Sequence, residues 1–317
     1  MIQEIYKMNF PKPKIVVSKC LGFSKCRYNG QIISDEFVES LRPFVKFITV
    51  CPEIEIKLGV PRDSLRIVDG KLIQTKTEKD FSDKINKFSD DFLNSLKNID
   101  GFILKNRSPS CGIGDVRIYG KNNRVIKKSN GFFGDKVLKK FPDLPIEDEG
   151  RLRNFKIREH FLIKLFTLTN FKKINSIKKL NDFHEHNKFL FMAYSQVLQK
   201  KLGKIVAHNT IFQETYKEYK CVLEKLLNSP CKTSSTINSL NHIYSHFHKK
   251  LNQKEKKYFL ENIEEFKNKN IPLSTLTHLL YSWALRFNDN YLVNQTIFMP
   301  YPEELIKISD SGKGRDL

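Results

Sequence analysis

Three cysteines in the first part of the chain each follow an apolar, β-branched run. Cys20 ends the run that starts at residue 14, Cys51 follows the run from 47, and Cys111 lies soon after the run from 101. Short apolar runs separated by helix-length connections predict buried parallel strands of an α/β sheet. Ligands of such sheets bind beyond the carboxyl ends of the strands, so we expect the three thiols to meet in one crevice. Three thiolates at one opening could hold a metal centre with one coordination position left free.

The groups that could move protons beside these cysteines are restricted by composition. All eight histidines lie after residue 159, so a general acid or base here must be a carboxylate, or less often Lys or Tyr. Glu53, two residues after the second cysteine, is the candidate. The segment 108–112 (Ser-Pro-Ser-Cys-Gly) predicts a tight polar loop whose hydroxyls and amides could hold a small heterocycle or cluster sulfides. In and after this loop, Gly112 and Gly114 allow close backbone approach.

The identity of the metal stays open at the level of individual residues. Zinc accepts three thiolates plus water, but paired Cys-x-x-Cys spacings and nearby histidines are missing from the sequence. Iron–sulfur clusters commonly use thiolates spread over different loops. Cys26 follows the first strand end by six residues, and we interpret it as a packing or spare cysteine. Cys221 and Cys231 lie in helical context and are interpreted as core or surface thiols.

The domain organisation follows from a composition break near residues 142–154, which hold two prolines, an acidic cluster and a glycine. Before the break, strand-like runs alternate with helical ones, and an Asp-Gly pair predicts a hairpin over 66–74. After it, amphipathic periodicity predicts helices almost throughout. We therefore expect an α/β fold: a Rossmann-like parallel-sheet domain at 1–148 and an all-α domain at 149–317. The predicted helices cover 34–41, 78–96, 151–169, 177–202, 209–227, 233–251, 255–268 and 273–287.

Charge and cysteine content set the class of partner and compartment. The net charge is +20, and residues 151–250 carry 19 basic against 6 acidic residues. A polyanion such as nucleic acid is the obvious partner, although solvated lysines of a Lys- and Asn-rich composition are the alternative. No apolar window is long enough to span a membrane, and residues 1–9 do not predict a secretory leader. Scattered cysteines do not resemble a secreted disulfide framework, so we expect a cytoplasmic protein.

Combined motifs over residues 12–145 resemble the thiouracil desulfidase family. They are Val-Ser-Lys-Cys-Leu-Gly at 17–22, Cys-Arg-Tyr-Asn-Gly at 26–30, Val-Cys-Pro-Glu at 50–53 and the stretch 105–112. The resemblance implies a [4Fe-4S] cluster held by Cys20, Cys51 and Cys111, with the fourth iron open to the substrate's sulfur. Family catalytic positions fall on Glu53, as the base, and Ser108, which would orient it by hydrogen bonds. Asn29 stands where many relatives have Asp, and 55–62 replaces a more glycine-rich stretch.

Two later segments, 180–208 and 300–305, resemble the YbgA-like helical domain. Its fusion to a desulfidase domain resembles the tRNA 4-thiouridine desulfidases, in which the helical part recruits tRNA. This implies an iron–sulfur-dependent, non-redox desulfidase that converts 4-thiouridine in tRNA to uridine. The candidate phosphate contacts are Arg151, Arg153, Lys156, Arg158, Lys172, Lys173, Lys178, Lys179, Lys188, Lys200, Lys201 and Lys204.

Two alternative functions remain open. The same chemistry could act on free thiouracil or thionucleotides, with the helical domain serving assembly. A non-catalytic RNA-binding or sensor protein with zinc or a cluster is the other. The sequence does not predict the tRNA species, the sulfide acceptor or the oligomeric state.

Overall fold

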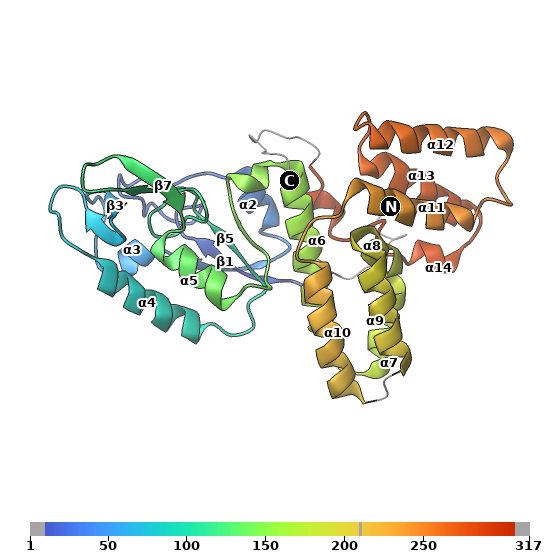
Figure 1. Cartoon of the computed structure of the whole chain (residues 1–317), viewed down its shortest axis with the longest axis horizontal. Coiled ribbons are helices and arrows are strands. Elements are labelled where there is room, and N and C mark those ends of the chain that lie inside the picture. The colour runs from blue at the N-terminus through green and yellow to red at the C-terminus, as the bar shows by residue number, and fades with distance from the viewer. Residues whose placement is uncertain (1–9, 209–210, 308–317) are drawn as a thin grey trace. The chain divides into compact units, whose positions relative to one another are not determined.

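The computed structural model describes residues 10–208 and 211–307, which form two compact units (Figure 1). One unit comprises Met1–Thr169 with Glu304–Leu317, and the other comprises Asn170–Glu303. The first is α/β and the second is all-helical, so the predicted fold class is confirmed. The predicted domain boundary after residue 148 stays a prediction about sequence domains. The expectation of no leader concerns residues 1–9, which lie outside the described residues.

The first sheet is parallel and has the strand order β2-β1-β5-β8. Strand β1 is buried from its second residue onward and β5 along its whole length, which explains their uninterrupted apolar sequences. The chain moves from β1 to β2 on one side and later places β5 on the other side of β1. The sheet therefore has a switch point at β1, where ligands of such sheets bind. The strands are β1 (Lys14–Ser18), β2 (Lys46–Val50), β5 (Gly101–Leu104) and β8 (Ile146–Asp148).

A second, mixed sheet has the order β4-β3-β6-β7. Its antiparallel β3–β4 pair confirms the predicted hairpin. The β6–β7 pair was not predicted because β7 has the sequence Val-Ile-Lys-Lys-Ser and is exposed along almost all its length, without a buried alternate face. The strands are β3 (Leu65–Val68), β4 (Lys71–Gln74), β6 (Val116–Tyr119) and β7 (Val125–Ser129).

Helices pack on the parallel sheet and fix the loops that follow its strands. The core contains Val16 of β1, Phe102 of β5 and Phe133 of α5 (Phe132–Lys140), and the side chain of Cys111 lies in this same cluster. Helix α4 (Ser82–Ser95) contributes Leu93 to it. The first unit also contains α2 (Glu36–Leu41), α3 (Pro52–Glu55), the 3-10 turn η1 (Arg151–Arg153) and most of α6 (Phe155–Phe171).

The helical unit differs from prediction most at 177–202, and the short α14 (Asn290–Val293) was not predicted. The expected helix at 177–202 is three helices, which break at Asn187 and Ser195. Asn187 is buried, donates its side-chain amide to the Phe183 carbonyl and accepts from the Thr296 hydroxyl at 2.7 Å. Such bonds compete with the helical backbone pattern, which periodicity alone does not reveal. No helix among the described residues could cross a membrane.

The remaining predicted helices are confirmed with shifted ends, except that residues 209 and 210 at one predicted start lie outside the described residues. The elements of this part are α7 (Ile177–His186), α8 (Lys188–Tyr194), α9 (Gln196–His208), α10 (Phe212–Leu226), α11 (Thr233–Ser245), α12 (Gln253–Lys267), α13 (Leu273–Arg286), α14 (Asn290–Val293) and η2 (Glu303–Leu305).

Candidate active site

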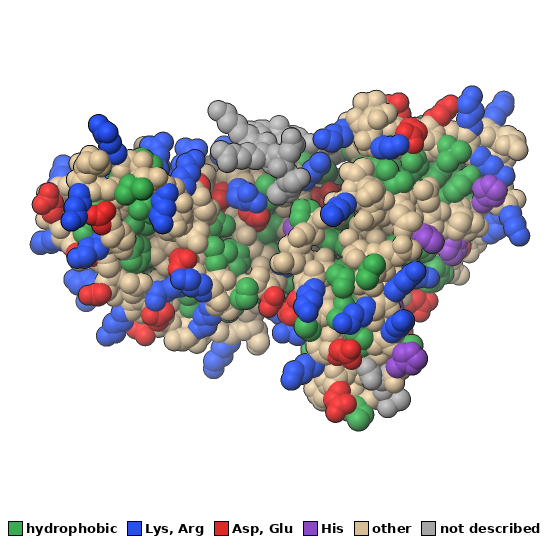
Figure 2. Space-filling view, in the orientation of Figure 1, with side chains coloured by type: hydrophobic (Ala, Val, Ile, Leu, Met, Phe, Trp, Pro, Cys, Tyr) green, Lys and Arg blue, Asp and Glu red, His purple; other side chains and the backbone are tan. Residues whose placement is uncertain are grey.

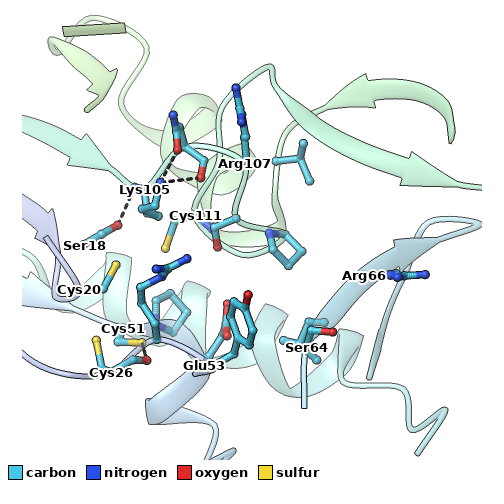
Figure 3. A pocket seen from close by; sticks show the side chains of 18 of the residues that line it. Ser18, Cys20, Cys26, Cys51, Glu53, Ser64, Arg66, Lys105, Arg107 and Cys111 are labelled. Atoms are coloured by element: carbon cyan, nitrogen blue, oxygen red, sulfur yellow. Dashed lines mark hydrogen bonds between the residues drawn. The ribbon is translucent and has the colours of Figure 1, made fainter. Parts of the chain in front are cut away.

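A cavity of about 730 Å³ lies beyond the carboxyl ends of β1, β2 and β5. Its walls come from the loops after these three strands and from one face of the second sheet. Cys20, Cys26, Cys51 and Cys111 all line it, so the predicted meeting of the three strand-end cysteines is confirmed. Figure 3 shows Cys20, Cys26 and Cys51 close together, with Cys111 beside them. All lining residues belong to the first unit.

Cys51 and Cys111 are nearly enclosed, whereas Cys20 is partly exposed. Cys51 is the N-cap of α3, and Pro52 occupies the first helical position, where its missing N–H costs nothing. The pKa of Cys51 is raised by its hydrogen bond with Cys26 and then by burial. Burial raises the pKa of Cys111 as well, although the hydroxyls of Ser18 and Ser108 beside it oppose the shift. Sequence position thus explains why these thiols converge, and packing explains why they are sheltered from water.

Cys26 lies in the cluster rather than outside it. Its side chain is 4% exposed, lines the cavity and hydrogen-bonds with the thiols of both Cys20 and Cys51. The bond with Cys20 is the main reason that the pKa of Cys26 is raised to about 11. Its carbonyl accepts from the Cys51 thiol at 3.8 Å. Of the two interpretations of Cys26, as a packing or a spare cysteine, its burial fits packing, and its hydrogen bonds place it beside the other thiols.

The carboxylate of Glu53 is held on both oxygens. Arg62 donates to Oε2 from Nε at 2.9 Å and from Nη2 at 2.5 Å, and Ser110 donates to Oε1 at 2.9 Å. The side chain of Arg62 is 3% exposed and that of Glu53 13%. Arg62 also donates to the carbonyls of Cys26 and Gly59 at 3.0 Å. A buried, doubly held carboxylate at the cavity wall is suited to accept a proton from a positioned water.

The hydrogen bond that orients Glu53 comes from Ser110, whereas prediction placed it on Ser108. The Ser108 hydroxyl instead accepts from the amides of Ser110 and Cys111 at 3.2 and 3.1 Å, which closes the turn that carries Cys111. Ser108 lines the cavity, so its predicted catalytic role stays a prediction. Sequence reasoning missed Arg62 and did not separate the two serines. The only available signal was a lone Arg directly after Pro61.

Two glycines of this loop serve different purposes. A Cβ on Gly112 would lie 2.9 Å from the Ser108 carbonyl oxygen, which confirms the predicted close approach. Gly114 has open space around it but a φ of +75°. Glycine is favoured there because other residues rarely adopt this backbone conformation. From the neighbouring helix α5, Gly134 presses on the same turn, because its Cβ would meet the Gly112 carbonyl oxygen at 2.5 Å.

Lys105 brings a cation to the end of β5. Its ammonium group contacts the carboxylate of Glu149 and the side-chain oxygen of Asn106. The backbone N–H of Asn106 donates to the same Glu149 carboxylate at 2.8 Å. The backbone N–H of Lys105 donates to the Ser18 hydroxyl at 2.9 Å. These contacts tie the ends of β1 and β5 together beside Cys111 (Figure 3).

The donor set fits a polynuclear group better than a single ion. Among the described residues, no group of three or more His, Cys, Asp and Glu side chains is placed to hold one metal ion. Yet four sulfur donors line one cavity, without histidine. Soft thiolates from separate loops are the usual ligands of iron–sulfur clusters, whose corners space the thiolates apart.

The predicted nucleic-acid contacts divide into exposed and buried residues. Arg158 is 6% exposed and donates to the carbonyls of Leu152, Arg153 and Lys307, so its assignment to RNA is corrected to a structural role. Lys188 is partly buried over the rings of Phe189 and Tyr291. Lys and Arg side chains are spread over the visible surface of both units (Figure 2). The exposed candidates are Arg151, Arg153, Lys156, Lys172, Lys173, Lys178, Lys179, Lys200, Lys201 and Lys204.

Comparison with known proteins gives the family. A family model described as 2-thiouracil desulfurase matches residues 15–149, the part of the chain that contains the cavity. The Bacillus subtilis (strain 168) protein YbbK is 32% identical over 113 residues, which are 32% of this chain and 75% of that protein. The chain belongs to the 2-thiouracil desulfurase family. In this desulfurase-family chain a second model, "Protein of unknown function (DUF1722)", matches residues 188–302.

Two further relatives resemble parts of this desulfurase-family chain. The Escherichia coli (strain K12) protein YbgA is 25% identical over 169 residues, covering 52% of this chain and 95% of that protein. A solved structure described as the [4Fe-4S]-dependent thiouracil desulfidase TudS is 26% identical. It covers 44% of this chain and 93% of its own, with a TM-score of 0.36.

Proposed function

We propose that this protein is a [4Fe-4S]-dependent, non-redox desulfidase that converts 4-thiouridine in tRNA to uridine. The observation that carries the proposal is the meeting of four thiols and a doubly held carboxylate in one cavity of a 2-thiouracil desulfurase family member. The cofactor is the one named for TudS. A cytoplasmic location, where thiols stay reduced, is part of the proposal.

Cys20, Cys51 and Cys111 are the proposed cluster ligands. They follow β1, β2 and β5, which are neighbours in the sheet, and all three line the same cavity. Cys26 lies against two of them and supports the site from behind. When bound, the cluster would supply a Lewis-acidic iron with an affinity for soft thiocarbonyl sulfur.

Glu53 is the proposed general base. It takes a proton from the water that adds to the carbon bearing the sulfur, and later returns a proton to the ring nitrogen or to the departing sulfur. The overall reaction adds water to C=S and yields C=O and hydrogen sulfide, so no electrons are transferred. Arg62 and Ser110 keep the carboxylate in place throughout, and Ser108 shapes the loop beside it.

The tRNA part of the proposal is supported by charge and by the second domain. Residues 151–250 carry 19 basic and 6 acidic residues, and the exposed Lys200, Lys201 and Lys204 lie on α9. Phosphate neutralisation by such residues supplies much of nucleic-acid affinity. The second candidate is desulfidation of free thiouracil, which the description of the matching family model favours.

The decisive experiment is anaerobic incubation of the reconstituted full chain with tRNA that contains 4-thiouridine, followed by nucleoside analysis. Loss of 4-thiouridine with an equal gain of uridine is expected. Glu53→Gln should keep the visible absorption of the cluster and lose turnover, whereas Glu55→Gln, an exposed carboxylate on the same short helix, should keep both.

The other outcomes separate the alternatives. Turnover of 2-thiouracil without any loss of 4-thiouridine from tRNA would point to the free base as substrate. If the anaerobically purified protein were colourless, contained zinc and turned over neither 2-thiouracil nor 4-thiouridine in tRNA, the result would support the non-catalytic function. Full activity of Glu53→Gln would remove Glu53 from the mechanism.

A further inference from the structure

The mouth of the cavity is strongly cationic. Two acidic residues, Glu53 and Asp115, line the cavity, whereas the basic residues that line it are Lys19, Arg27, Arg62, Arg66, Lys105, Arg107, Arg117 and Lys128. Arg62 is paired with Glu53 and Lys105 with Glu149. Among the described residues, the other six basic residues of the lining form no ion pair with a carboxylate, and Arg66, Arg107, Arg117 and Lys128 are exposed.

Three of these cations form a row across the second sheet. Arg66 is on β3, Arg117 on β6 and Lys128 on β7, which are consecutive strands. Arg117 and Lys128 are direct cross-strand partners. The β3–β6 register pairs Ile67 with Ile118, which places the preceding residues of the two strands, Arg66 and Arg117, next to each other.

All three side chains are exposed and line the cavity, while Ile67 and Ile118, which follow Arg66 and Arg117 on their strands, are buried in the core of this sheet and do not line it. Within the described residues, Arg66, Arg117 and Lys128 form no ion pair with a carboxylate. Like charges on neighbouring strands destabilise a sheet. A row that costs stability and has no carboxylate partner among the described residues indicates an external anion.

We propose that the row Arg66–Arg117–Lys128 binds consecutive phosphates of an RNA strand and thereby presents its thiolated base to the thiols. The inference rests on the proposed desulfidase function of the same cavity and assigns part of RNA binding to the catalytic unit itself. With strands about 4.8 Å apart, three strands span about 10 Å, which is longer than one phosphate group. The row therefore suits a phosphodiester chain better than a single phosphate.

Two aromatic side chains line the same cavity as the phosphate row and the thiols. Tyr119 lines the cavity with the Arg66 guanidinium 5.1 Å from its ring centre, and Tyr28, which is 45% exposed, lines it from the Cys26 loop. Proteins that read single-stranded RNA stack unpaired bases on such rings. In Figure 3, Ser64 and Arg66 lie on the side away from Cys20, Cys26 and Cys51, with Glu53 between them. This order of groups matches a nucleotide, with sulfur at one end and phosphate at the other.

The test compares two triple variants of the full chain. Arg66→Gln/Arg117→Gln/Lys128→Gln removes the row, and Lys84→Gln/Lys87→Gln/Lys97→Gln removes three exposed lysines that do not line the cavity. Binding of 4-thiouridine tRNA is measured over a range of salt concentrations. Each lost phosphate contact reduces the slope of log K against log salt by about 0.7–0.9, so the row variant should lose about 2–3. Its affinity should fall at least about tenfold at physiological salt, by the same counterion release. The control should change little.

Several results would overturn the inference. An unchanged affinity and salt slope in the row variant is one, and an equal loss in the control is another. If 4-thiouridine 5′-monophosphate bound as tightly as the tRNA and with the same salt dependence, the ligand of the row would be a free nucleotide rather than RNA. Should the triple variant not fold, Lys128→Gln alone, on the edge strand, must still lower the slope by about one.

Turnover of uncharged 2-thiouracil keeps this test separate from that of the proposed function. The row variant should turn over 2-thiouracil as the parent does, and its thermal midpoint should be equal or higher because like charges have been removed. Loss of turnover in the parent on every substrate would refute the desulfidase. The salt slope of tRNA binding would then still decide whether the row binds RNA.

Discussion

Removal of Arg62 tests how strongly burial couples this residue to Glu53. Arg62→Met removes the guanidinium, leaves Glu53 with the Ser110 hydroxyl and removes the Arg62 hydrogen bonds to the carbonyls of Cys26 and Gly59. Breaking a buried pair by removing one partner costs about 3–5 kcal/mol, because the other charge stays enclosed. Glu53→Gln should cost about 1–3 kcal/mol. Since both variants remove the same interaction, the double variant should cost about 2 kcal/mol less than their sum.

A matched control for this pair exists in the same unit. Arg42 and Glu39 form the same type of ion pair, with contacts of 2.5 and 2.8 Å, but their side chains are 41% and 42% exposed. Arg42 also contacts the Gly22 carbonyl and the Phe23 ring, contributions that a double-mutant cycle cancels. Exposed pairs are worth about 0–1 kcal/mol, so the Arg42→Met and Glu39→Gln cycle should give a small coupling.

The assay must report on the first unit, because Trp283, the single tryptophan, lies in the helical unit. Native-state hydrogen exchange of peptides over 36–62 gives local opening free energies for both pairs in one experiment. The expected order is a larger coupling at Arg62–Glu53 than at Arg42–Glu39. Equal couplings would refute the reasoning that enclosure, rather than ion-pair geometry, gives this contact its strength.

Two further predictions concern helix packing and pH. Gly203→Ala should stabilise α9 by up to about 1 kcal/mol, since its Cβ would only approach the end of the His184 ring at 3.3 Å. Gly134→Ala should destabilise the first unit by about 1–2 kcal/mol, because its Cβ would clash with the rigid Gly112 carbonyl. Urea titrations and cluster iron content check both signs. Burial, with the nearby charge of Lys188, lowers the pKa of His184 to about 4. Below about pH 6.5 the unfolded chain therefore binds a proton at His184, whereas the folded chain does not bind it until about pH 4. Stability of the helical unit should fall over that window when followed by Trp283 fluorescence, and His184→Gln should flatten the decline; an identical pH profile would contradict this origin.

Three strands of the parallel sheet could be predicted from their apolar runs, and two of them, β1 and β5, are buried on both faces, whereas the short, partly buried β8 was not predicted. Residues 14–18, 46–50 and 101–104 lie inside the predicted runs or within one residue of them, and connectivity then places their following cysteines at one edge. The β6–β7 pair could not be found in this way, since the sequence of β7 is exposed and basic. Such a strand owes its pairing to its neighbour rather than to its own pattern.

The contacts that organise the site arise between side chains of different loops. Ser110 reaches Glu53 across 57 positions, and Arg62 reaches it from a separate loop, so neither contact has a periodic signature. Ser108 and Ser110 are equivalent in the linear sequence. They differ only once the turn forms, because Ser108 then accepts from two amides of the turn and Ser110 alone is left to face the carboxylate.

The proposed function is consistent with the distribution of groups within the first unit, which would let one cavity serve both a small base and a polymer. The thiols, Glu53 and Arg62 are enclosed at the strand ends, where low water content strengthens each polar contact. The unpaired cations lie at the mouth, where solvent keeps them charged and able to exchange counterions for phosphate. Under the proposals above, chemistry at the sulfur depends on the thiols, Glu53 and Arg62, and selection for a nucleic acid depends on the cations that form no ion pair. Changes at the rim should alter which substrates arrive while leaving intact what happens to the C=S bond once it is bound.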